Sequence, residues 1–275
     1  MDYPSNGKEK PEKEILDTAI EAAHIGGEVL LTHLSRVQLY EVEKKGDFDF
    51  ATLVDHASEK AIIEHVRAKF PDHKVLAEEG GEIPGPGMYR WVIDPLDGTT
   101  NYIHGVRIFG VSIAVMRGDD PVVGVVHDPV RGETFASAKG HGAYLNGAPI
   151  EVSEHAELKE CLLATGFPFR SKTLIAPYLE SFKRFFMQVR DIRRMGSASI
   201  DLAYVAAGRF DGFWELNLSR WDIAAGVLLV QEAGGEVSGF IPGEDIWQTG
   251  NIVASNGKIH QKITEELQQI FGRNI

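Results

Sequence analysis

The chain has a single cysteine, Cys161, among its 275 residues. One cysteine excludes a disulfide within the chain and is typical of a protein in a reducing compartment. No apolar run approaches the roughly 20 residues that a bilayer-spanning helix needs, and the opening MDYPSNGKEKPEKE holds no hydrophobic signal segment. We therefore expect a cytoplasmic protein with no membrane-spanning segment.

Basic residues are fewer than acidic ones. The chain has 28 Lys and Arg and 40 Asp and Glu, which gives a net charge of −12. Nucleic acids and anionic membranes attract clustered Lys and Arg, so this balance disfavours direct binding to either. It does not exclude a small phosphorylated ligand, since a metal ion or a helix N-terminus reverses the field around one site.

Several catalytic and nucleotide-binding motifs are also missing. The sequence holds neither GxGxxG nor GxxxxGK[ST], which argues against a dinucleotide enzyme or a P-loop ATPase. It has no GxSxG turn either, so nothing indicates a covalent serine nucleophile in an α/β-hydrolase setting.

A hydrophobic fraction of 43% with 25% charged residues is typical of a folded globular protein. Helical spacing predicts helices over residues 11–34 and 53–70, and short strands between residues 74 and 145 predict a mostly antiparallel sheet. After residue 150, strands and helices alternate. We expect an α/β protein of two layered units, residues 1–150 and 151–275.

The segment WVIDPLDGTTNYIHG, residues 91–105, runs an apolar strand into two acids. If the strand ends near Asp94 and a helix begins after Asp97, the amides of Gly98 and Thr99 form an anion site at a helix N-terminus. Two carboxylates beside an anion site require a cation between them. Oxygen ligands without His or Cys favour Mg²⁺ over zinc.

Further acids stand beside turns or helix starts, and each has an ordinary structural interpretation on its own. Asp222, ahead of an Ala-rich helix, is most simply an N-cap, and Glu78 in LAEEGG is most simply part of a solvated turn. Asp94 and Asp97 with a divalent ion between them indicate hydrolysis of a phosphate ester. Metal ions screen the phosphate charge and lower the pKa of a bound water, and Thr99 is placed to orient that water.

These motifs resemble those of the inositol monophosphatase family. WVIDPLDGTTNY is similar to its D-P-x-D-G-T-x-N-F/Y signature, and RWDIAAGVLLVQEAGG resembles its second signature. LAEEGG, the K-x-x-x-D-x-x-T-x-x-D run from Lys45 to Asp55, and RRMGSASIDLAYVAAGRFDGFWE match further family segments. The matches keep the family order over residues 45–255, and TGFPF with RRMGSAS resembles the bacterial inositol-1-monophosphatase branch.

The resemblance implies a layered α/β/α/β/α sandwich shared with fructose-1,6-bisphosphatases, usually as a homodimer. Residues 1–150 would carry most metal ligands, and residues 151–275 would carry the substrate side and Asp222. Two or three Mg²⁺ ions are implied, with Lys45 on a mobile loop beside a weaker third ion. The implied ligands are Glu78, Asp94, the Leu96 carbonyl, Asp97 and Asp222.

The resemblance also implies catalytic and substrate roles. Thr99, with Asp55 behind it, would activate the water; Glu78 and Asp97 complete the implied catalytic set. The Gly98 and Thr99 amides would hold phosphate. Substrate hydroxyls would contact Asp97, the Ala198 backbone and Glu215.

The implied activity is Li⁺-sensitive hydrolysis of myo-inositol monophosphate or a similar small polyol phosphate. Two alternatives stay open. One is a fructose-1,6-bisphosphatase activity, alone or in addition. The other is an interaction protein of the transcription machinery in which catalysis is incidental.

Overall fold

The structure is a computed structural model that describes residues 10–34, 42–46, 49–169 and 171–272. An 8-stranded sheet has the order β10-β9-β8-β7-β6-β5-β3-β4, in which only the β3–β5 pair is parallel. Its strands are β3 (Lys74–Ala77), β4 (Gly81–Ile83), β5 (Tyr89–Asp97), β6 (Gly110–Arg117), β7 (Asp120–Asp128), β8 (Glu133–Ala138), β9 (Ala143–Leu145) and β10 (Ala148–Ile150).

A second, 5-stranded sheet is mixed and has the order β12-β11-β13-β15-β14. Its strands are β11 (Leu162–Thr165), β12 (Asp191–Arg193), β13 (Gly212–Glu215), β14 (Glu236–Ser238) and β15 (Ile252–Ser255). A separate hairpin pairs β1 (Val42–Gly46) with β2 (Asp49–Thr52).

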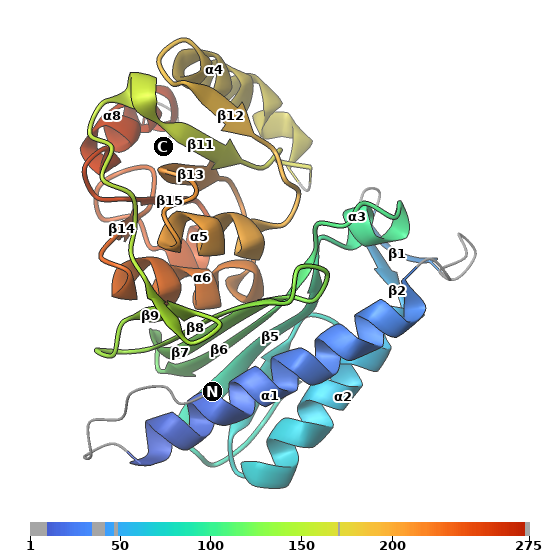
Figure 1. Ribbon diagram of the computed structural model, residues 1–275. Helices are drawn as coiled ribbons and strands as arrows, with labels where there is room; N and C mark the ends of the chain where they lie inside the picture. Colours follow the sequence, from blue (N-terminus) through green and yellow to red (C-terminus); the bar gives the residue numbers. More distant parts are fainter. Residues whose placement is uncertain (1–9, 35–41, 47–48, 170, 273–275) are drawn as a thin grey trace.

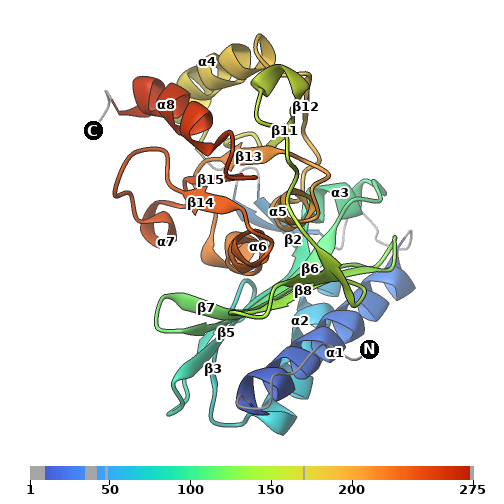
Figure 2. The ribbon, with the colours of Figure 1, turned by 60° about the vertical axis from the view of Figure 1, so that its left-hand side comes forward.

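The helices form layers around the two sheets (Figures 1 and 2). Helices α1 and α2 cover one face of the large sheet. Helices α5 and α6 lie between the sheets, and α4 and α8 cover the outer face of the small sheet. The helices are α1 (Lys10–His33), α2 (Leu53–Lys69), α3 (Thr99–Ile103), α4 (Ile175–Phe186), α5 (Ala198–Ala206), α6 (Arg220–Glu232), α7 (Ile246–Thr249) and α8 (His260–Phe271), with short 3₁₀ turns at Leu158–Glu160 and Lys172–Leu174. The layered α/β/α/β/α fold predicted from the sequence is therefore confirmed.

Three hydrophobic cores join the five layers: one between the large sheet and its outer helices, one around α5 and α6 between the two sheets, and one between the small sheet and its outer helices. Successive strand residues point to opposite faces of a sheet, so one strand serves two cores. On β5, Trp91 and Ile93 face α1 and α2 while Val92 faces the middle layer. On β11, Ala164 faces the middle layer and Leu163 the outer helices.

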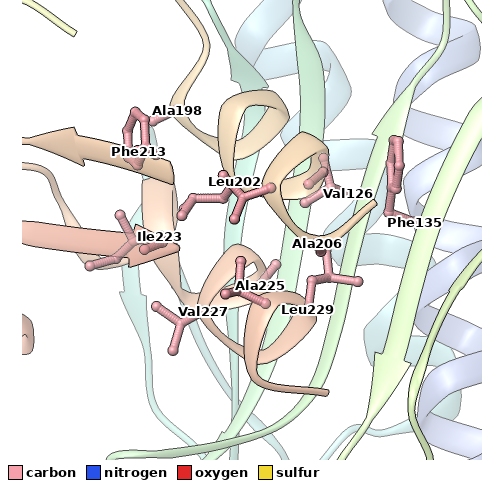
Figure 3. Close-up of a cluster of buried hydrophobic side chains, with 14 of the residues drawn as sticks. Val126, Phe135, Ala198, Leu202, Ala206, Phe213, Ile223, Ala225, Val227 and Leu229 are labelled. Carbon is pink, nitrogen blue, oxygen red and sulfur yellow. The ribbon is translucent and has the colours of Figure 1, made fainter. Parts of the chain in front are cut away.

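The middle core holds α5 and α6 between the sheets (Figure 3). Nearly every side chain of α5 is buried, and α6 is buried from Asp222 to Val230. Such all-round burial requires contacts on more than one side of a helix. This burial fixes the position of α6, and of the residues at the N-terminus of α6, relative to the end of β5.

Most elements lie where the sequence predicts them, whereas four short strands and a one-turn helix were missed. These are the β1–β2 hairpin, β4, β10 and α7, none longer than 5 residues. Elements this short carry too few residues to display a period. The division at residue 150 stays a prediction. No helix among the described residues is both long and apolar enough to cross a membrane.

Helix α6 approaches the large sheet most closely at Gly124 of β7. A Cβ atom there would lie 2.7 Å from the Ala225 carbonyl oxygen, which is backbone and cannot rotate away. We expect Gly124→Ala to lower the free energy of unfolding by about 1–3 kcal/mol, the usual cost of overpacking a core. Urea unfolding measures this change.

Ser137 provides the control, because it pairs with Gly124 across β7 and β8. Its buried hydroxyl has no hydrogen-bond partner among the described residues, so Ser137→Ala should leave stability unchanged or raise it. Equal stability of Gly124→Ala and the unsubstituted protein would contradict the proposed close contact.

Candidate metal and phosphate site

The DPLD turn begins where β5 leaves its regular ladder. Asp94 pairs with Ser112 and Asp97 with Gly110, and the register shifts between them. Asp94 Oδ1 accepts a hydrogen bond from the Leu96 amide at 3.0 Å, which closes the turn on itself. The strand was expected to end near Asp94 but resumes through Asp97, and helix α3 then begins at Thr99 as predicted.

Glu78 reaches the site because β3 and β5 are parallel neighbours. Ala77 aligns with Ile93, and the Glu78 amide donates to the Ile93 carbonyl at 3.2 Å. Glu78, which follows β3, and Asp94 of β5 therefore lie side by side. Burial raises the pKa of Asp94 well above its usual range, and the charges of Glu78, Asp97 and Asp222 raise it further.

Asp222 comes from the middle layer. The ordinary structural interpretation of Asp222 as an N-cap does not hold: α6 begins at Arg220, Ser219 is the N-cap, and Asp222 is the N3 residue of a capping box. Its Oδ2 accepts from the Ser219 amide at 2.7 Å. Carboxylate oxygens of Asp94, Asp97 and Asp222 all lie within 4.8 Å of one another.

Asp97 is held by donors at the N-terminus of α5. Its Oδ2 accepts from Ser197 Oγ at 2.6 Å, from Ser199 Oγ at 2.6 Å and from the Ser199 amide at 2.7 Å. Burial raises the pKa of Asp97, and these hydrogen bonds oppose the rise. Sequence reasoning missed both serines, although the RRMGSAS segment that carries them was recognised.

Thr99 connects the site to α2. Its hydroxyl lies 3.0 Å from the Leu96 carbonyl oxygen and 3.3 Å from Oδ1 of the buried Asp55, in the first turn of α2. Gly98 precedes it with φ = 93°, and a Cβ there would lie 3.0 Å from the Ile108 carbonyl oxygen. Both backbone angle and space therefore require glycine at this position.

A cavity of about 330 Å³ brings the predicted residues together. Ala198 and Glu215 line it along with the carboxylates, Leu96, Gly98 and Thr99. Asp55 lies behind Thr99. Lys45 belongs to β1, whose side chains lie outside the described part of the chain, so its predicted role is untested.

Asn101 ties the site loop to the turn before α5. Its amide nitrogen donates to the Ile108 carbonyl at 2.8 Å and to the Met195 carbonyl at 2.9 Å. These bonds hold the loop after Gly98 and the Met195–Gly196 segment in a fixed relation.

The donor set fits a hard divalent cation. Every ligand candidate is oxygen, and no His or Cys stands among the described residues that line the cavity. Buried like charges raise one another's pKa, and a cation between them removes that penalty. The same cavity therefore suits Mg²⁺ and an anion that shares it.

A sequence model of the inositol monophosphatase family matches residues 12–271. The chain therefore belongs to this family.

Among its relatives, Nus factor SuhB of Pseudomonas aeruginosa is 46% identical over 259 residues, which are 92% of this chain and 96% of that protein. Nus factor SuhB of Escherichia coli K12 is 46% identical over 246 residues, 89% and 92% of the two chains. The solved suhB structure from Bartonella henselae superposes with a TM-score of 0.90 at 39% identity, covering 93% of this chain and 99% of that one. The inositol monophosphatase from Anabaena gives 0.84 at 40% identity, with 94% and 96% covered.

The raised pKa of Asp94 sets a pH dependence for the metal-free protein. The folded carboxyl holds its proton more tightly than the unfolded one, so this group's contribution to stability falls as pH rises from about 3.8 through the folded pKa. Asp94→Asn removes that charge. In EDTA at pH 8 we expect a gain of about 1–3 kcal/mol in the free energy of unfolding, vanishing toward pH 4.

Asp128→Asn is the matched control, because Asp128 is equally buried but accepts from Arg131 Nη1 at 2.8 Å. Its substitution breaks a pair and should lower stability. Denaturant unfolding across pH 4–9 compares the two variants. A loss of stability in Asp94→Asn at pH 8 would refute the repulsion assigned to the cluster.

Proposed function

We propose that this protein is a Mg²⁺-dependent phosphomonoesterase that hydrolyses myo-inositol monophosphate or a similar small polyol phosphate. The observation that carries the proposal is the meeting of Asp94, Asp97 and Asp222 within 4.8 Å, beside Gly98 and Thr99. Family membership supports the reaction class, and an inositol monophosphatase is among the structural relatives.

The proposed metal ligands are Glu78, Asp94, the Leu96 carbonyl, Asp97 and Asp222. Bound Mg²⁺ would supply charge neutralisation of the phosphate and acidification of water. The two serines on Asp97 Oδ2 support this assignment, because they fix one oxygen and leave the other to face the cavity. Sensitivity to Li⁺, a role for Lys45 beside a third ion, and a homodimer belong to the same proposal.

Thr99 and Asp55 are proposed to orient the attacking water. Because the Thr99 hydroxyl donates toward Asp55 and the Leu96 carbonyl, its oxygen lone pairs remain to accept a hydrogen bond from water. Asp55, buried behind it, would take up the proton that moves along this path. A cytoplasmic location is also proposed, because the one thiol, Cys161, is free and buried.

The substrate is proposed to lie between two walls. Amides of Gly98 and Thr99 would hold the phosphate, where the missing Cβ of Gly98 lets an anion approach the backbone. At the other wall, Glu215, Asp97 and the Ala198 carbonyl would accept hydrogen bonds from substrate hydroxyls. Both walls belong to the one cavity.

Asp97→Asn tests the metal assignment. We expect kcat/KM for inositol 1-phosphate to fall by about 10³-fold or more, because one ligand and its charge are lost. Phosphate release is measured with and without Mg²⁺ and Li⁺, and also on fructose 1,6-bisphosphate and phosphoadenosine phosphate. Asp120→Asn removes the same charge at a half-exposed position paired with Lys139 and should change nothing. Near-normal activity of Asp97→Asn would overturn the assignment.

A second candidate function is an interaction with the transcription machinery, with or without catalysis. The observation that favours it is the name Nus factor SuhB carried by relatives 46% identical to this chain. The charge of −12 makes protein a better candidate partner than RNA.

Affinity capture with the tagged Asp97→Asn protein separates the two functions. A stoichiometric polymerase-associated partner that binds this variant as well as the unsubstituted chain is the expected result for an interaction independent of catalysis. Capture that yields no such partner with either protein would contradict the second function.

A further inference from the structure

Glu59 of α2 is a buried carboxylate that is not among the described residues lining the cavity. It is 5% exposed, and its Oε2 accepts a hydrogen bond from the Glu79 amide at 2.8 Å. Burial raises the pKa of Glu59, and hydrogen bonds from the Glu79 and Gly80 amides oppose the rise. Burying a carboxylate is costly unless donors satisfy it. Here the donors are two consecutive amides of one turn.

These amides belong to the turn that carries Glu78. Strands β3 and β4 are joined by residues 78–80 alone. Glu78 lines the cavity, whereas the Glu79 carboxylate points toward α2, where its Oε2 lies 3.9 Å from His56 Nε2. The backbone of this short turn therefore decides where the Glu78 carboxylate lies.

The turn is held at both ends. At its start the Glu78 amide donates to the Ile93 carbonyl of β5 at 3.2 Å. Toward its end Glu59 accepts from the Glu79 amide, and a Cβ on Gly80 would lie only 2.8 Å from Glu59 Oε1. Glycine at position 80 therefore leaves the space that the carboxylate needs to reach the backbone. Both oxygens of Glu59 thus lie against the turn.

Helix α2 supports other parts of the site from the same face. Asp55, Ser58 and Glu59 are spaced i, i+3 and i+4, which makes them neighbours on a helix surface, and all three are buried. Asp55 accepts from the Thr99 hydroxyl at 3.3 Å, and Ser58 Oγ donates to the Pro95 carbonyl at 3.1 Å. One helix face therefore contacts three segments of the site: the start of α3, the DPLD turn and the turn after β3.

We propose that Glu59 is a positioning residue for the metal site. It holds the turn after β3 so that the Glu78 carboxylate faces Asp94, and it thereby raises the affinity for the ion without contacting ion or substrate. The inference rests on the proposed Mg²⁺-dependent function and names a residue outside the cavity on which that function depends. Substituting groups that orient metal ligands from outside the coordination sphere typically weakens metal binding about 10- to 100-fold.

Glu59→Gln removes the charged acceptor. Calorimetric titration with Mg²⁺ alone should give a Kd about 10-fold higher or more, because a neutral amide oxygen accepts more weakly than a carboxylate. The Mg²⁺ concentration that half-saturates hydrolysis of inositol 1-phosphate should rise with it, while kcat at saturating Mg²⁺ stays near the unsubstituted value. If Glu59 were purely structural, the variant would unfold at a lower temperature in EDTA and keep its Mg²⁺ affinity, which would overturn the inference.

Gly80→Ala separates position from charge. The substitution keeps every charge of the site, but its Cβ would displace the Glu59 carboxylate from the turn. Mg²⁺ affinity should therefore fall as it does in Glu59→Gln. Because both substitutions act on one contact, their effects should not add in the double variant, and additive losses would contradict a shared contact. Gly80→Ala also carries the test if Glu59→Gln does not fold.

Glu64→Gln is the matched control. It removes the same charge from the same helix at an exposed position, where Glu64 Oε1 lies 3.9 Å from Lys60 Nζ. This variant should bind Mg²⁺ as the unsubstituted protein does. An equal loss of affinity in Glu64→Gln, or unchanged affinity in both Glu59→Gln and Gly80→Ala, would overturn the inference.

Measuring binding and hydrolysis separately keeps this inference apart from the proposed function. If the unsubstituted protein binds Mg²⁺ but hydrolyses no phosphate ester, the phosphatase proposal fails, and the Mg²⁺ affinities still decide on Glu59. If the unsubstituted protein binds no Mg²⁺, the proposed function and the inference both fail.

Discussion

The mutual repulsion of four carboxylates is the constraint around which this molecule is arranged. Glu78 and Asp94 leave two parallel strands side by side, Asp97 ends the turn after β5, and Asp222 approaches from α6. Burial, and then the charges of the other three carboxylates, raise the pKa of Asp94 and oppose folding with this group ionised. The surrounding structure must therefore hold each carboxylate against a force that would separate them.

Three of the four carboxylates are held by local hydrogen bonds. Asp222 belongs to a capping box at the start of α6, Asp97 accepts from Ser197 and Ser199, and Asp94 binds the Leu96 amide. The middle core provides the long-range part, because α6 is buried on all sides between the sheets. Apolar burial at about 1.5–3 kcal/mol for each large side chain readily offsets the repulsion within the cluster.

The sequence predicted the layered fold and the turn at the centre of the site, but it did not predict the distant residues that complete the site. The short strands between residues 74 and 145 were visible, and the DPLDGTT turn was sufficient to argue for a cation beside an anion site. Local sequence patterns could not predict hydrogen bonds between residues that lie far apart along the chain. Ser199 reaches Asp97 across 102 residues, and no local pattern marks a serine for that contact.

Two further errors have local physical reasons. Asp222 was read as an N-cap because an acid before an Ala-rich run is typical of one, but Ser219 three residues earlier competes for the position and wins. Arg194, which also lines the cavity, carried no signal, because its contact with the Phe167 ring forms only in the folded chain. Ser219 is a neighbour of Asp222 in the sequence, whereas Phe167 lies far from Arg194 along the chain.

The carboxylate cluster also bears on the choice between enzyme and interaction protein. A chain selected only to bind a partner gains nothing from buried acids that repel one another, since neutral side chains in the same places would make the fold more stable. The relatives' name describes a role in transcription, but it supplies no reason for Asp94 to sit beside Glu78. A bound cation would give a reason for this arrangement, because its positive charge attracts each carboxylate and offsets the repulsion between them. The buried cluster thus supports the metal-dependent part of the proposed function, whatever partner the chain has in addition.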